Sequence, residues 1–152
     1  YEPAYQLTDE QKDEGSYAFT VTGPTVNESF EFEPSPGSRA IYNQGVDMMR
    51  ILARDRDNPK NTLMVDFKGN STGTYPLNSE LGKECTVVIG VANDDGTMRL
   101  SGMLSHSMDG ELRITEVKKG GYVQGEFKGV TKIENQPHEV KGTFKVRMRG
   151  SI

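Results

Sequence analysis

The sequence predicts a single, mostly-β domain, built as an antiparallel sandwich or a flattened barrel of about nine or ten strands. Apolar residues alternate with polar ones through much of the chain, which is the period of a strand with one buried face. Turn-forming clusters interrupt this alternation roughly every 8–17 residues, a spacing typical of all-β folds. The length of 152 residues fits one domain. A closed, lipocalin-like barrel is the alternative architecture.

The first 14 residues are expected to be a flexible leader, and residues 15–152 the folded domain. Tyr1, Tyr5 and Leu7 are the only large apolar side chains of that leader, too few to form a core. The chain opens without an initiating Met, so any signal peptide or lipid anchor is expected upstream of Tyr1.

The first strands follow from alternating aromatic and aliphatic residues. Tyr17, Phe19 and Val21 would share one face of a strand, and Phe30 and Phe32 would do the same in the next. The sequence PSPG at 34–37 then ends the second strand.

The middle of the chain contains one ambiguous segment. Residues 38–47 fit either a short helix or extended chain, whereas 48–54 and 62–68 alternate as an antiparallel hairpin should. The turn cluster DRDNPKN at 55–61 would connect them. The remaining strands are expected, in order, at 74–75, 84–92, 98–104, 112–117, 122–127 and 140–148.

Charge and cysteine content exclude several classes of function. The net charge of −4 argues against nucleic acid as the main partner, because phosphate binding requires clustered Lys and Arg. The single cysteine, Cys85, excludes an intrachain disulfide and lies in the apolar run CTVVI, which indicates a small buried hydrophobe. No stretch reaches the ~20 apolar residues that span a bilayer.

One internal pattern repeats. The segment VQGEFK at 123–128 recurs as VKGTFK at 140–145, with a looser echo, LSGML, at 100–104. In each, large apolar residues lie two positions before and two positions after a glycine, so all three point to the same face of the strand. Such a glycine leaves room for a bulky neighbour or lets the strand bend, so we expect these segments to curve the sheet. A hollow for a ligand is the functional interpretation of the same glycines.

These motifs also carry a resemblance. The segments GTYPL at 73–77 and GELRIT at 110–115, followed by the two VxGxF strands, resemble a β-rich domain common in surface lipoproteins of Bacteroidetes-type bacteria. The similarity covers roughly residues 15–148, with Pro76 and Lys128 departing from the usual pattern. The resemblance implies an exported, lipid-tethered domain of the cell envelope, and it transfers no catalytic residues.

No catalytic residue is predicted. His106 lies between serines near Asp109, but the chain contains no GxSxG nucleophile elbow. His106 and His138 are therefore interpreted as surface turn histidines, and two histidines with one buried thiol do not make an ordinary zinc site. The sequence predicts no cofactor.

Candidate binding residues come from exposed-looking aromatic and acidic positions. Tyr42, Tyr75, Tyr122 and His106 are the predicted ligand contacts. Two acidic turns could supply oxygen ligands to calcium, although neither follows the twelve-residue calcium loop. The calcium candidates are Asp55, Asp57, Asp94 and Asp95.

Three functions fit these observations. The favoured one is a non-catalytic, exported or cell-envelope binding or adhesion module that forms part of a lipoprotein and associates with a membrane only through an upstream lipid anchor. Its partner would be a glycan, a peptide or a protein at the cell surface. The alternatives are a lipocalin-like carrier of a small apolar ligand and, last, an envelope hydrolase.

Overall fold

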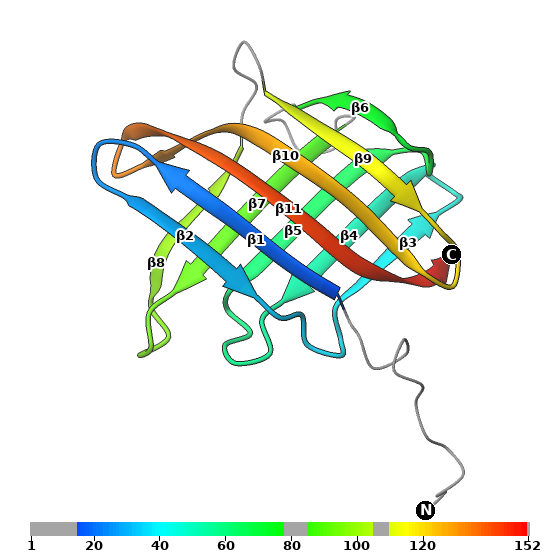
Figure 1. Ribbon diagram of the computed structural model, residues 1–152, viewed down its shortest axis with the longest axis horizontal. Coiled ribbons are helices and arrows are strands. Elements are labelled where there is room, and N and C mark those ends of the chain that lie inside the picture. Colours follow the sequence, from blue (N-terminus) through cyan, green and yellow to red (C-terminus); the bar gives the residue numbers. More distant parts are fainter. Residues whose placement is uncertain (1–14, 78–84, 105–109, 152) are drawn as a thin grey trace, which may run out of the picture.

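The computed structural model describes residues 15–77, 85–104 and 110–151, with side chains described to residue 148 (Figure 1). The predicted leader at 1–14, His106 and the turn at Asp109 lie outside these ranges. The described residues contain no helix that is long and apolar enough to cross a membrane.

The described chain forms eleven strands, which confirms the predicted mostly-β class. The sequence of residues 38–47 fits either a short helix or extended chain, and the structure forms a strand there. The alternate residues Ala40 and Tyr42 of this strand pack towards the core. The strands are β1 (Gly15–Thr22), β2 (Asn27–Phe32), β3 (Arg39–Asn43), β4 (Met48–Arg54), β5 (Thr62–Lys68), β6 (Gly73–Pro76), β7 (Cys85–Ala92), β8 (Met98–Met103), β9 (Glu111–Val117), β10 (Tyr122–Ile133) and β11 (Gln136–Ser151).

The strands form one curled sheet that folds into two layers (Figure 1). The front layer contains β2, β1, β11, β10 and β9, and the layer behind it contains β3, β4, β5, β7 and β8. The long strand β11 joins the layers, because its first part pairs with β1 and its end pairs with β3. The β11–β3 pair is parallel, which departs from the expected fully antiparallel arrangement. The result is a flattened barrel.

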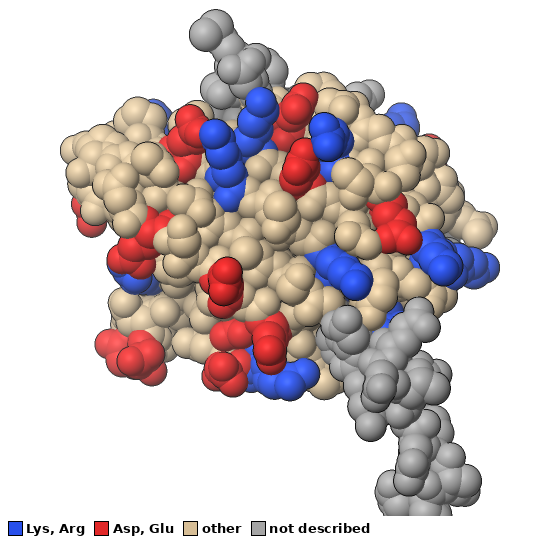
Figure 2. Space-filling view, in the orientation of Figure 1, with Lys and Arg blue, Asp and Glu red and all other residues tan. Residues whose placement is uncertain are grey.

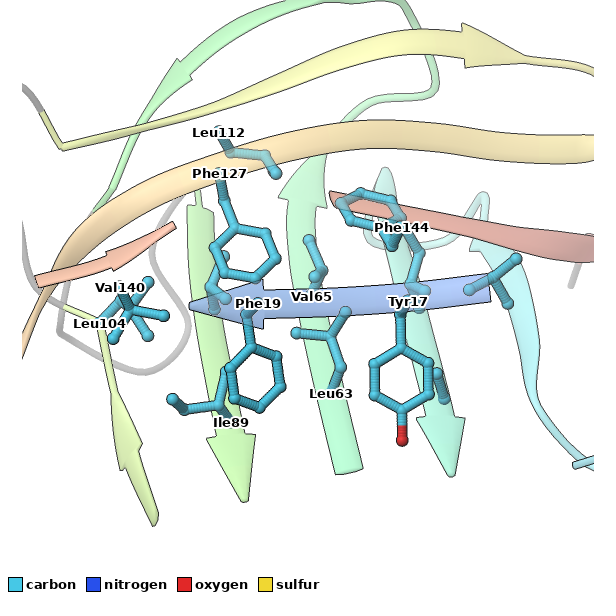
Figure 3. Close-up of a cluster of buried hydrophobic side chains, with 14 of the residues drawn as sticks. Tyr17, Phe19, Leu63, Val65, Ile89, Leu104, Leu112, Phe127, Val140 and Phe144 are labelled. Atoms are coloured by element: carbon cyan, nitrogen blue, oxygen red, sulfur yellow. The ribbon is translucent and has the colours of Figure 1, made fainter. Parts of the chain in front are cut away.

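The interior between the layers is filled by side chains. Tyr17 and Phe19 point inward from β1, and Leu63, Val65 and Ile89 meet them from the opposite layer (Figure 3). All five are at most 2% exposed. Burial of this apolar surface stabilises the domain at about 25 cal/mol per Å².

The repeated glycines make room for aromatic rings, as the sequence predicts. Gly125 lies opposite Phe144, and Phe127 lies opposite Gly142 on the neighbouring strand. A Cβ placed on Gly142 would lie 2.4 Å from Cζ of Phe127, and one on Gly125 would lie 2.8 Å from Cζ of Phe144. In the looser echo, a Cβ on Gly102 would lie 2.1 Å from Oγ1 of Thr131, so β8 approaches β10 closely there.

The interpretation of His138 as a surface residue is wrong, since its side chain is 1% exposed. Nε2 accepts hydrogen bonds from the backbone N–H groups of Thr25 and Val26, both at 3.2 Å. Nδ1 lies 2.8 Å from the carbonyl oxygen of Gln136, to which it donates. Through these hydrogen bonds the imidazole links the β1–β2 turn to the start of β11, two segments that lie far apart in the sequence.

Cys85 is fully buried at the start of β7, as predicted. Burial, with a smaller contribution from the Asp66 carboxylate, raises the pKa of its thiol from 9.0 to about 12. The neutral thiol is thus favoured in the folded state, so this contribution to stability is complete below pH 9 and is lost as the pH rises towards 12.

We therefore expect the free energy of unfolding to fall above pH 9, by at most about 1.4 kcal/mol per pH unit from this group. Urea unfolding at several pH values measures the slope. Cys85→Ala should flatten it between pH 9 and 10, because Tyr17, whose pKa burial also raises, contributes only above its ordinary value of 10.0. Identical slopes for the two proteins would contradict this assignment.

Candidate functional site

The outer face of the front layer carries two adjacent rows of mostly polar side chains that cross five strands. The strand register aligns the first row from β9 to β2. Its members are Glu111, Lys128, Lys141, Thr20 and Ser29. These side chains point outward because their neighbours in each strand point into the core.

The second row lies two residues along each strand from the first. The same register aligns it across the same five strands. Its members are Arg113, Glu126, Thr143, Ala18 and Glu31. The central members are small and the outer ones long, so the middle of the row is lower than its ends.

Between the two rows the chain surface is hollowed, with a volume of about 630 Å³. The hollow is lined by both rows and by Phe19, Phe30, Phe127 and Gly142, which belong to the inward-facing row between them. The repeated glycine motif therefore lies directly under the hollow. On the inner side, the Phe127 ring occupies the space that a side chain at position 142 would need.

Most charged side chains of the hollow lie on β9, β10 and β11, and Glu31 on β2 adds a carboxylate at the opposite end. Figure 2 shows Lys or Arg and Asp or Glu side chains gathered over β9 to β11, beside a central area without charge. Arg113 Nε lies 3.2 Å from a Glu126 carboxylate oxygen. On the other side of the hollow, Thr20 Oγ1 and Ser29 Oγ are 3.0 Å apart. The site thus offers charged groups of both signs at the β9 end, and hydroxyl groups together with the Glu31 carboxylate at the β2 end.

The tyrosines predicted as ligand contacts lie outside this hollow, on three different strands. Tyr42, on β3, donates a hydrogen bond from its hydroxyl to the Asp47 carboxylate, which raises the pKa of the tyrosine. Tyr75, on β6, donates to the carbonyl oxygen of Ser71 at 2.6 Å, and its ring centroid lies 5.0 Å from that of Phe67. Each of these side chains is engaged locally.

Tyr122, on β10, points to the outer face but is 8% exposed. Its hydroxyl accepts a hydrogen bond from Arg147 Nη2 at 3.0 Å, and the Lys145 ammonium lies 4.3 Å from the ring centroid. Cation–π contacts of this kind stabilise a pair by about 0.5–1 kcal/mol at exposed sites. The structure therefore does not bring the three tyrosines into one cluster.

The acidic turns proposed for calcium are stabilised by their own hydrogen bonds. Asp55 is buried, and its Oδ2 accepts from the backbone N–H of Asn58 at 3.1 Å. Asp95 Oδ1 accepts from the N–H and the hydroxyl of Thr97, which lowers the pKa of the carboxyl group. Asp57 and Asp94 are exposed. In the part of the chain that the structure describes, no three His, Cys, Asp or Glu side chains are placed to hold a metal ion.

Sequence reasoning did not select the residues of the hollow. Its outward-facing residues are mostly polar positions in or next to predicted strands, which is the ordinary pattern of a solvated face, whereas Phe19, Phe30 and Phe127 were predicted to face the core. The only available signal was the repeated glycine motif, which marked β10 and β11.

Comparison with protein-family models, curated proteins and solved structures gives no match for this chain.

Proposed function

We propose that this domain is a non-catalytic binding module of the cell envelope that holds a glycan in the hollow across β2, β1, β11, β10 and β9. The observation that carries the proposal is the hollow itself, formed by two aligned rows of polar and charged side chains. Glycans bind through many hydroxyl groups, which both donate and accept hydrogen bonds. The Thr and Ser hydroxyls and the Glu carboxylates of the two rows complement them.

Two features favour an open binding face over a carrier or a hydrolase. The core side chains of both layers fill the interior where a carrier would hold an apolar ligand. Meanwhile, His138 and Cys85 are buried away from the hollow, and the imidazole is fully engaged in hydrogen bonds. Export and a lipid tether are supported by the sequence resemblance alone.

Filling the hollow is expected to abolish binding without unfolding the domain. Thr143→Trp would place an indole at its centre, on an exposed position of β11. Thermal denaturation against a glycan panel measures the effect. A glycan at ~100 times its dissociation constant should stabilise the wild type by about 2.7 kcal/mol, which raises the midpoint by several degrees.

The matched control is Thr115→Trp, an exposed threonine on β9 that does not line the hollow. This variant should keep the full ligand-induced shift, whereas Thr143→Trp should lose it. A ligand that stabilises both variants equally would bind elsewhere and would contradict the proposal. A panel in which no glycan shifts the wild type would contradict it as well.

A further inference from the structure

We infer that the glycan held by this hollow is acidic, with its anionic group bound between Lys128 and Lys141. The inference rests on the proposed function and adds the ligand class. It starts from the register, which places these two lysines directly opposite each other on β10 and β11. Both of them line the hollow.

Two lysines at directly opposed positions repel each other. Cβ atoms of such a pair are about 4.5–5.5 Å apart, and like charges at this distance destabilise a sheet. An anion placed between the two ammonium groups removes the repulsion and gains two charge-assisted hydrogen bonds. The pair is therefore a ready site for a carboxylate or a sulfate group.

The neighbouring carboxylates neutralise this pair only in part. Lys141 Nζ lies 3.2 Å from Glu139, but both side chains are more than half exposed, so the ion pair is weak. Glu126 is engaged by Arg113. Within residues 15–77, 85–104 and 110–148, Lys128 has no carboxylate oxygen within ion-pair distance. Glu111 on β9 is the register partner of Lys128 on the side away from Lys141. Since no ion pair joins the two side chains, this carboxylate compensates the charge of Lys128 only in part.

The rest of the hollow favours a saccharide over an acidic peptide. The site lies on the face of the sheet, where the backbone groups of β1, β10 and β11 are already paired on both sides. A peptide strand would instead seek a free sheet edge. Thr20, Ser29 and Thr143 provide hydroxyls beside the lysine pair. A row across five strands spans about 19 Å, enough for several linked sugar units.

The test compares an oligogalacturonate with its methyl ester, two ligands with the same sugar backbone that differ in charge. Isothermal titration with the full chain measures both affinities. We expect the acid to bind about 10- to 100-fold more tightly than the ester, as for hydrogen bonds to charged groups. The double variant Lys128→Met/Lys141→Met should bind both ligands equally and should melt no lower than the wild type.

The matched control, Lys68→Met/Lys132→Met, removes the same charge from exposed positions outside the hollow and should keep the preference for the acid. Equal binding of acid and ester by the wild type, lost in Thr143→Trp, would overturn the inference and leave the proposed function standing. Binding of neither ligand, with no other acidic glycan bound, would overturn the inference, and the proposed function would be overturned as well only if neutral glycans also failed to stabilise the wild type. Equally tight binding of free sulfate or acetate, or of polyglutamate, would overturn the assignment to a glycan.

Discussion

Gly142→Ala is expected to lower the free energy of unfolding by about 3 kcal/mol, towards the upper end of the cost of overpacking a core. The added Cβ would lie 2.4 Å from Cζ of Phe127 and 2.6 Å from the backbone oxygen of Ala18. The ring could rotate, but the carbonyl belongs to β1 and moves only with its strand. The substitution therefore forces β1 and β11 apart where they pair.

Urea denaturation measures this loss as a shift of the midpoint. The matched control is Gly37→Ala, because nothing lies within 4 Å of a Cβ at that position and its backbone is not left-handed. That variant should stay within about 0.5 kcal/mol of the wild type. Similar midpoints for the two variants would contradict the close packing described for β11.

His138→Ala is expected to cost about 4 kcal/mol, since it leaves a cavity and removes the hydrogen-bond acceptor for the N–H groups of Thr25 and Val26. A second variant separates the two losses. His138→Phe fills most of the volume but accepts no hydrogen bond, so it should cost about 2 kcal/mol. Chemical denaturation of the three proteins measures both steps. Wild-type stability in His138→Phe would show that the hydrogen bonds contribute little.

The order of strands along the chain could be predicted well, because alternation is a local property. Phe30 and Phe32, or Leu63 and Val65, mark an inward face without knowledge of any partner strand. Residues 122–127 were predicted too short, since β10 continues to Ile133. The turn follows at Glu134 and Asn135, which both have positive φ angles.

The candidate site could not be predicted, because it depends on which strands become neighbours. Thr20 and Lys141 lie side by side only because β1 pairs with β11. Likewise, His138 looked like a loop residue from Pro137 and its polar neighbours, and only the distant turn at Thr25 makes it a buried acceptor. Such contacts between remote segments leave no periodic signal in a single sequence.

The place of β11 in the fold also determines when the domain can form. Gly15 pairs with Val146, and Ala40 pairs with Met148. The two layers therefore cannot be joined through β11 until this strand, the last of the described chain, has been made. During synthesis, most of the chain would leave the ribosome without its central strand. Folds dominated by such remote pairings also form slowly, in milliseconds to seconds. Until β11 is in place, its partner strands β1, β10 and β3 each lack one neighbour and leave a row of backbone groups unpaired.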